Sequence, residues 1–271
     1  QKDFARTTFN EKVELLAKEN VENELFKLYY YFEFGALHDE KLTLAVNYLD
    51  FLGTKELSAE DIQKEFYKLG CNFGVSTGQD NMYMTVSGLQ ENFKEAVKLF
   101  ESLIGNAQPN KEVYAAMVDD ILKSRADAKL DKGTILKSGM VNYAKFGKKS
   151  PFTDILSEKE LKAIDPAELT KILADLRNYP HKIIYYGPSS VSQAKANLKG
   201  IKYEAKTYKE IPEKQVYTEK DIKKTNVLFV NYDMVQAEVI FLSKSGMYDV
   251  ELVPKTKLYN EYFGGNMGSI V

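Results

Sequence analysis

Residues 25–35, LFKLYYYFEFG, place an aromatic or branched side chain at every second position. A spacing of two puts these side chains on one face of a β-strand, while Lys27 and Glu33 fall on the other face. The stretch therefore predicts a strand with one face against a hydrophobic core. The side chains expected on that inner face are Phe26, Leu28, Tyr30, Phe32 and Phe34.

Helical and strand patterns alternate on both sides of this stretch. Residues 42–52, LTLAVNYLDFL, are too apolar for a surface strand and precede Gly53, so they predict a mostly buried helix. Residues 71–77 and 82–87 alternate around GQDN and predict a β-hairpin. Apolar spacing, caps and breakers predict the remaining elements: strands at 11–19 and 181–186, and helices at 58–69, 90–104, 109–128, 135–146, 167–178 and 191–198.

The C-terminal part of the chain changes character at residue 202. Residues 202–224 are rich in Lys and Glu with little periodicity, which is typical of a linker. Beyond it, the pattern predicts strand-like residues 227–242, with a break near Asp233, and a helix at 258–264 that closes on a glycine turn at Gly264-Gly265. Together the patterns predict an α+β fold, a two-layer sandwich of helices on a mixed, largely antiparallel sheet. The expected organisation is a domain at 1–205 (with a lead-in at 1–23), a linker at 206–223 and the start of a second domain at 224–271.

Composition excludes several classes of function. The 37 basic and 39 acidic side chains give a net charge of −2, which argues against a nucleic-acid partner. The chain has no apolar run of about 18 residues, so no membrane span is expected. Residues 1–20 lack the apolar core of a secretory signal, and the absence of an initiator Met suggests a processed protein or an excised piece.

Metal-binding residue types are scarce. Cys71 is the only cysteine, so neither an intrachain disulfide nor a thiolate zinc cluster is expected. His38 and His181 are the only histidines, and they lie too far apart in sequence for a local imidazole pair. We expect Cys71 to be a small buried side chain, His38 a surface loop residue and His181 the start of a strand.

The order strand, buried helix, capped helix, hairpin, helix, long helix resembles the zinc peptidases with an inverted motif, family M16, which includes pitrilysin, insulysin and mitochondrial processing peptidase. The matching segments are FEFG at 32–35, the helix ending in Gly53-Thr54, GCNFGVST at 70–77 and GLQENFKEAVKLFESLI at 88–104. The resemblance covers residues 24–205 well and residues 224–271 more weakly. It implies a metallopeptidase-like domain similar to those of mitochondrial processing peptidase.

The matching positions of this chain do not hold the residues of that family's catalytic motif, H-x-x-E-H. The resemblance places Asn47 at the first zinc histidine, Asp50 at the catalytic glutamate and Phe51 at the second histidine. The third ligand, a glutamate on the long helix, would fall at Asp119 or Asp120. A phenylalanine has no lone pair for a metal. The resemblance therefore implies a degenerate site with no metal in this chain, and zinc in the catalytic half of a parent protein.

Three functions are compatible with this pattern. The first is a catalytically silent lobe of a zinc metalloendopeptidase, which helps to enclose and bind peptide substrate. Its partner would be an N-terminal catalytic half of the same protein or a separate catalytic subunit. The second is a non-catalytic interaction or assembly subunit homologous to the peptidases. The third is an unrelated hydrolase that uses Asp50 with Asp119 or Asp120 as paired carboxylates.

Two further expectations concern surfaces and location. The run Tyr29-Tyr30-Tyr31 alternates between sheet faces, so some of its rings either line a peptide chamber or cover an interdomain contact. The apolar side chains of residues 227–242 need a partner, so we expect residues 224–271 to dock on their own sheet, swap with a second copy or be open to proteolysis. Bacterial relatives suggest the periplasm or cell envelope.

Overall fold

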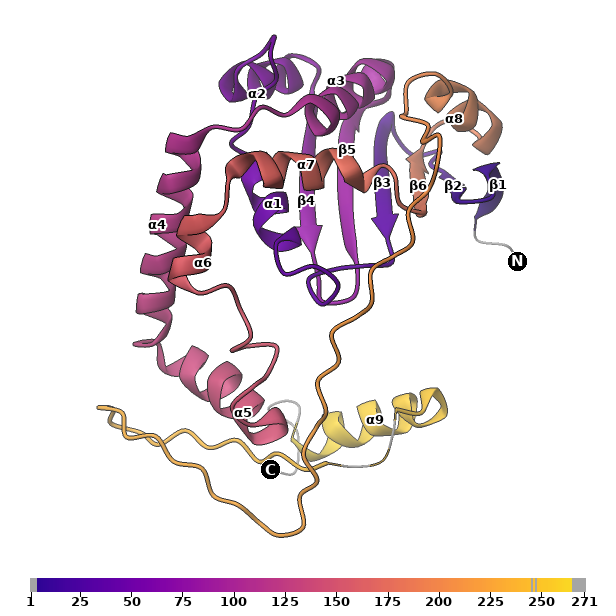
Figure 1. Ribbon diagram of the computed structural model, residues 1–271. Helices are drawn as coiled ribbons and strands as arrows, with labels where there is room; N and C mark the ends of the chain where they lie inside the picture. Colours follow the sequence, from indigo (N-terminus) through magenta and orange to yellow (C-terminus); the bar gives the residue numbers. More distant parts are fainter. Residues whose placement is uncertain (1–3, 245, 247, 265–271) are drawn as a thin grey trace. The chain divides into compact units, whose positions relative to one another are not determined.

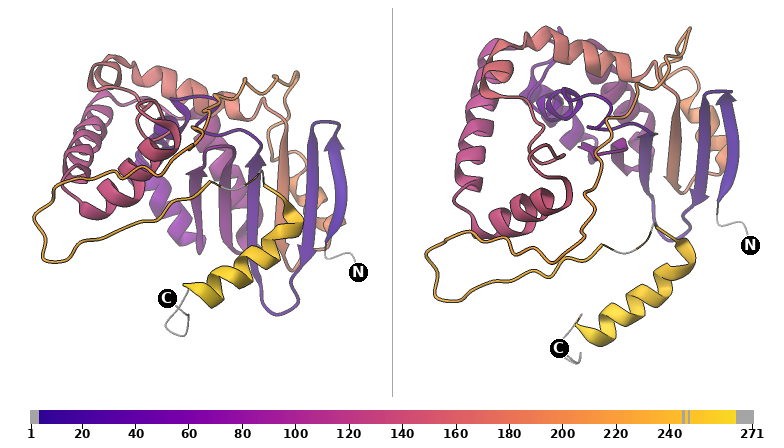
Figure 2. Two further views of the ribbon diagram at one scale, coloured as in Figure 1. Left: turned by 90° about the horizontal axis from the view of Figure 1, so that it is seen from below. Right: turned by 60° about the horizontal axis from the view of Figure 1, so that its bottom comes forward.

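Strands from distant parts of the chain form one mixed sheet in the computed structural model, which describes residues 4–244, 246 and 248–264 (Figure 1). The strand order is β1-β2-β6-β3-β5-β4, and the hairpin of β1 and β2 lies at one edge of the sheet in both views of Figure 2. Neighbouring strands are antiparallel except for β2 and β6, which run parallel. The strands are β1 (Ala5–Asn10), β2 (Val13–Glu19), β3 (Leu25–Phe32), β4 (Cys71–Thr77), β5 (Met82–Leu89) and β6 (His181–Gly187).

Helices α1, α3 and α7 lie in front of the strands in Figure 1 and cover one face of this sheet, while α4 and α5 lie to one side of it. Their apolar stripes point at the strands, as the spacing in the sequence predicts. The mixed sheet with a helix layer is the α+β sandwich expected from the pattern. The α-helices described in the part of the chain before residue 219 are α1 (Leu42–Leu49), α2 (Ala59–Lys68), α3 (Phe93–Asn106), α4 (Lys111–Ala128), α5 (Val141–Phe146), α6 (Glu158–Ala163), α7 (Pro166–Leu176) and α8 (Val191–Leu198).

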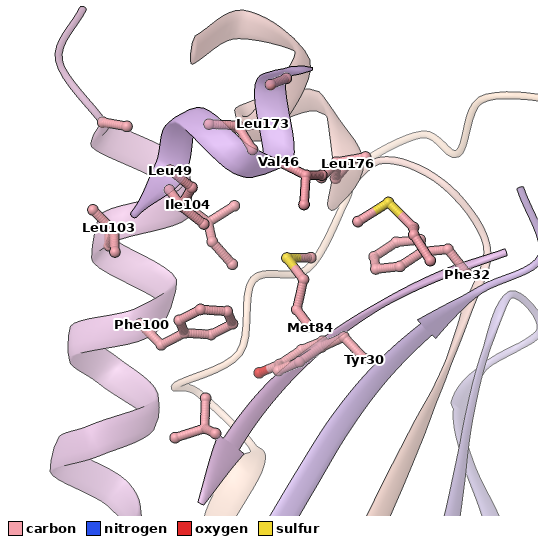
Figure 3. Close-up of a cluster of buried hydrophobic side chains, with 14 of the residues drawn as sticks. Tyr30, Phe32, Val46, Leu49, Met84, Phe100, Leu103, Ile104, Leu173 and Leu176 are labelled. Carbon is pink, nitrogen blue, oxygen red and sulfur yellow. The ribbon is translucent and has the colours of Figure 1, made fainter. Parts of the chain in front are cut away.

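The hydrophobic core lies between the sheet and these helices. Tyr30 and Phe32 of β3 point into it together with Met84 of β5, as Figure 3 shows. Burying one such side chain contributes about 1.5–3 kcal/mol, so this layer dominates the stability of the fold. The helix side chains that meet the strands in Figure 3 are Val46 and Leu49 of α1, Phe100, Leu103 and Ile104 of α3, and Leu173 and Leu176 of α7.

Helix starts follow the capping residues in the sequence. The Ser58 side chain accepts a hydrogen bond from the Asp61 N–H and begins α2, as predicted. The long helix begins at Lys111 and not at Pro109, because the Asn110 side chain accepts from the N–H groups of Glu112 and Val113. Residues 135–146, expected as one helix, consist of a π-helix (Thr134–Met140) followed by α5. The strand β1 and the short helix α6 were not anticipated.

The chain divides into two compact units, Gln1–Thr218 and Glu219–Val271. Residues expected to form a solvated linker lie along the first unit up to this boundary. The Gln215 N–H donates to the Leu37 carbonyl at 2.7 Å, and the Tyr217 hydroxyl donates to Asp154 at 2.7 Å. Residues 206–217 are therefore held by the first unit, which the Lys/Glu-rich composition did not indicate.

The second unit holds a 3₁₀ turn (Val250–Leu252) and α9 (Val253–Phe263), which begins five residues before the predicted start at 258. The strand prediction for residues 227–242 is wrong, because the described part of this unit contains no strand. A strand needs a neighbour for its backbone hydrogen bonds, and none is supplied here. Phe229 and Phe241 are 83% and 96% exposed. The glycine turn expected after the helix reaches residues outside the described ones.

Candidate functional site

The C-terminal end of α1 carries the three side chains that the sequence singled out. Asn47, Asp50 and Phe51 are spaced by three and four residues, which places them on one side of the helix. All three are exposed, and Phe51 is 54% exposed although it is aromatic. The intervening Tyr48 and Leu49 are fully buried and hold the helix on the core. The structure thus presents the three predicted positions together at the surface.

A buried tyrosine fixes α1 against the start of α4. The Tyr48 hydroxyl donates to the Asn110 carbonyl at 2.7 Å and accepts from the Asn110 N–H at 2.8 Å. Its ring meets the Tyr114 ring edge-on, with centroids 5.7 Å apart. Two hydrogen bonds and a ring contact leave little freedom between the helices, so the exposed side of α1 is a rigid surface.

The carboxylates on α4 belong to a different environment. Asp119 and Asp120 are both exposed. Asp119 lines a surface pocket of about 450 Å³ with Lys111 and Lys162, between α4 and α6. Partial loss of water raises the pKa of Asp50. The hydrolase that would use Asp50 with Asp119 or Asp120 as paired carboxylates stays a prediction.

This surface does not fit a zinc ion. Asn47 offers an amide and Phe51 an apolar ring, where zinc prefers imidazole, thiolate or carboxylate ligands. Within residues 4–244, 246 and 248–264, no three His, Cys, Asp or Glu side chains gather in a way that could hold a metal. The side chains at this surface therefore do not provide a zinc site for metal-dependent chemistry.

A metal titration tests this interpretation. We expect the purified chain to retain no stoichiometric zinc after equilibrium dialysis. The double variant Asn47→His with Phe51→His is expected to acquire measurable zinc affinity, because two imidazoles at i and i+4 then share one exposed helix face. About one zinc per wild-type chain, measured by atomic absorption, would contradict the interpretation.

The edge strand β4 packs beside α1 and carries none of the usual protection of a sheet edge. Its sequence, CNFGVST, has no charged residue and no proline, and its register with β5 is regular from end to end. The opposite edge, β1, carries Arg6 and has an irregular register between Thr8 and Asn10. Charges and bulges on edge strands block the addition of another strand. Only β4 therefore has the features of an acceptor strand.

The hydrogen-bond register shows which groups of β4 face outward. The Leu89 N–H donates to the Gly70 carbonyl, and the Gly78 N–H donates to the Asn81 carbonyl. Even-numbered residues of β4 therefore bond to β5, and the N–H and C=O groups of the odd-numbered ones point away from it. In the described part of the chain, the N–H groups of Phe73 and Val75 make no hydrogen bond. They are available to an added strand.

The other singled-out residues have structural roles. Cys71 is buried, as predicted, and burial raises the pKa of its thiol. His181 begins β6, as predicted, and is buried. His38 is not a free surface residue, because its Nδ1 accepts from the Gly35 N–H at 3.1 Å and closes a turn. Tyr30 is buried, whereas its two tyrosine neighbours in sequence point to the other face of the sheet.

Comparison with known proteins gives one family. The model of the insulinase family (peptidase family M16) matches residues 29–144, which include α1, β4 and α4. No curated protein matches the chain significantly. In the described residues, no helix is both long and apolar enough to cross a membrane.

Solved structures with the same fold come from bacterial peptidases. The inactive domain of an M16 peptidase from Pseudomonas fluorescens matches with 20% identity and a TM-score of 0.63, over 78% of this chain and 53% of that one. The periplasmic protease PqqL from Escherichia coli matches with 13% identity and a TM-score of 0.69, over 81% of this chain and 25% of that one. A protease from Helicobacter pylori matches with 14% identity and a TM-score of 0.61, over 80% and 54%. The chain thus spans between a quarter and about half of the length of these proteins.

Proposed function

We propose that this chain, whose residues 29–144 match the model of the insulinase family (peptidase family M16), is the catalytically silent lobe of a zinc metalloendopeptidase, which helps to enclose and bind peptide substrate. The observation that carries the proposal is the combination of α1 and β4. The positions of the zinc motif hold Asn47, Asp50 and Phe51, while the neighbouring edge strand keeps the open backbone groups that bind an extended peptide.

The partner in this proposal is a catalytic lobe that carries the zinc, either the N-terminal half of the same protein or a separate subunit. The matched structures of PqqL and of the inactive P. fluorescens domain support it, because each is longer than this chain. PqqL is described as periplasmic, which favours the bacterial periplasm or cell envelope for this protein as well.

Peptide binding to β4 is the direct test. We expect a fluorescently labelled, unstructured peptide of mixed sequence to bind the full chain, and Val75→Pro to weaken binding about tenfold. Proline removes the outward N–H at position 75, and a hydrogen bond of this kind is worth about 0.5–1.5 kcal/mol. The bonds between β4 and β5 stay intact, because position 75 does not donate to β5. The measurement is fluorescence anisotropy.

The matched control is Val75→Ala, which keeps the N–H and shortens the side chain. We expect it to change affinity less than the proline variant does. Equal binding by wild type and by a folded Val75→Pro variant would exclude the β4 edge as the site. A wild-type chain that binds no peptide and yet forms a stable, inactive complex with an M16 catalytic subunit would favour the assembly-subunit alternative over the substrate-binding lobe.

A further inference from the structure

The face of the sheet opposite the helices is not covered by any described element of the first unit. Residues on the core face of each strand are buried, and the alternate residues between them are exposed or half-buried. This second face, here called the open face, follows from the same period-two alternation that built the core. It is a feature independent of the β4 edge.

Tyrosines gather at the centre of the open face. Tyr31 of β3 lies opposite Tyr83 of β5. Tyr29 lies two residues before Tyr31 on the same face, and its ring centroid is 6.0 Å from that of Tyr83. On the other side of β3, Ile184 and Tyr186 of β6 lie in register with Tyr29 and Lys27. Tyr83 and Tyr186 are 39% and 44% exposed. Clustered tyrosines are typical of protein-binding surfaces, because each presents a large rigid ring and a hydroxyl that donates or accepts.

The open face carries a net positive charge, whereas the whole chain carries a net charge of −2. β1, β2, β3 and β6 direct four cationic side chains to this face, and two anionic side chains lie on it, Glu14 of β2 and Glu33 just after β3; the cations are Arg6, Lys18, Lys27 and Lys182. The chain as a whole has more acids than bases.

Two of these cations are already neutralised. The Nε of Arg6 lies 3.5 Å from the Oε1 of Glu14, and the Lys182 ammonium forms an ion pair with Glu33, just beyond β3. Lys18 and Lys27 have no carboxylate partner in the described part of the chain, and the Lys27 ammonium lies 5.2 Å from the centre of the Tyr29 ring. The open face therefore combines ammonium groups that have no carboxylate partner among the described residues with tyrosine hydroxyls.

We propose that the open face binds a carboxylate-rich polypeptide segment. Ammonium groups and tyrosine hydroxyls are the donors that carboxylates accept from, and a local excess of positive charge selects an acidic partner over a neutral one. The proposal stands apart from peptide capture at β4, since it concerns another surface and a charge preference that strand addition does not have.

Paired peptides test the charge preference. The probes are a labelled peptide of about twelve residues with alternating Glu and Ser, and the same peptide with Gln in place of Glu. We expect the full chain to bind the Glu peptide about tenfold more tightly at low salt, and the difference to shrink as salt is raised. Lys18→Gln with Lys27→Gln is expected to bring the affinity for the Glu peptide down to that for the Gln peptide.

Matched variants make each result decisive. Lys94→Gln with Lys98→Gln removes two exposed lysines from α3, on the helix layer, and is expected to leave both affinities unchanged. Val75→Pro should also leave the charge preference intact, which separates this surface from the β4 edge. Equal affinity for the two peptides, an equal loss in the α3 variant, or tighter binding to single-stranded RNA or to anionic vesicles than to the Glu peptide would each overturn the proposal.

Discussion

Replacing Arg177 with alanine is expected to lower the free energy of unfolding of this protein by about 3–5 kcal/mol, because it leaves a buried carboxylate without its counter-charge. The carboxylate belongs to Glu101, in the middle of α3, which is 7% exposed. The Tyr30 hydroxyl donates to Glu101 Oε1 at 2.9 Å, and Arg177 Nη1 lies 3.5 Å from Oε2. Burial raises the pKa of Glu101, and the Tyr30 hydrogen bond and the Arg177 charge oppose that rise.

The arginine also joins parts of the chain that are far apart in sequence. Its Nη1 donates to the Glu101 carbonyl at 3.3 Å, and its guanidinium lies 4.2 Å from the centre of the Tyr203 ring. A side chain at Gly105 would come within 2.3–2.7 Å of the guanidinium, so glycine is needed there to admit it. The loss of Arg177 therefore removes the charge partner and the cation–π contact together.

Urea unfolding of a short series of variants measures this. Glu101→Gln should cost less than Arg177→Ala, because a neutral amide is easier to bury than a lone carboxylate. The double variant should be more stable than the sum of the two single losses implies. The control is Lys64→Ala, which breaks an ion pair to Glu60 that is shorter, with the Lys64 Nζ 2.6 Å from the Glu60 Oε1, yet exposed to solvent. We expect no measurable change there. An Arg177→Ala variant as stable as wild type would show that the Glu101 carboxylate is solvated or protonated.

Local periodicity was sufficient to predict most of the elements. In β3, every second side chain is large and apolar, and the structure buries the same set. The hairpin of β4 and β5 followed from two alternating stretches around GQDN. Pattern methods work here because the side-chain direction repeats with a fixed period along each element. They fail where the element is too short or too polar to show a period, as for the six residues of α6 and for ARTTFN in β1.

Non-local features could not be predicted in the same way. The sheet places β6 between β2 and β3, although 148 residues, 33–180, separate β3 from β6 along the chain. The alternation in residues 227–242 is a strand pattern, yet a strand forms only where another strand supplies hydrogen bonds. The Glu101–Arg177 pair spans 76 positions, and neither residue stands out in the sequence. Tertiary contacts decide each of these, so the sequence pattern alone carries no signal for them.

The candidate site was partly predictable. Helical spacing alone puts Asn47, Asp50 and Phe51 on one side of α1, and the structure exposes all three. The resemblance did not predict the surroundings of Asp119, which lines a pocket together with Lys111 and Lys162 in the structure. The acceptor character of β4 was visible in its sequence as a lack of charge and proline. It became an edge strand only through the strand order of the whole sheet.

Acidification from pH 7 to pH 4 is expected to lower the free energy of unfolding by about 3 kcal/mol through His181 alone. Burial lowers the pKa of His181 from 6.5 to about 4, and the nearby positive charge of Lys202 acts in the same direction. The ring is packed against Phe32, with centroids 5.1 Å apart, and its Nδ1 lies 2.8 Å from the Tyr179 carbonyl. The unfolded chain takes up the proton near pH 6.5 and the folded one only near pH 4, so stability falls as pH falls through this window. At 1.36 kcal/mol for each pKa unit, the window contributes about 3 kcal/mol.

His181→Asn isolates this contribution. An asparagine amide replaces the ring Nδ1 as a donor to the Tyr179 carbonyl and stays neutral. The free energy of unfolding that is lost between pH 6.5 and pH 4 should therefore be smaller in this variant by about 3 kcal/mol, the contribution of His181. Glu101 acts in the opposite direction, since its raised pKa lets the folded state take up a proton before the unfolded one does. For that reason the informative quantity is the difference between variant and wild type at each pH, measured by urea unfolding. If His181→Asn kept the wild-type dependence of stability on pH, the His181 imidazole would have to be protonated within the fold near neutral pH. The apolar wall formed by Phe32 would then have to admit water.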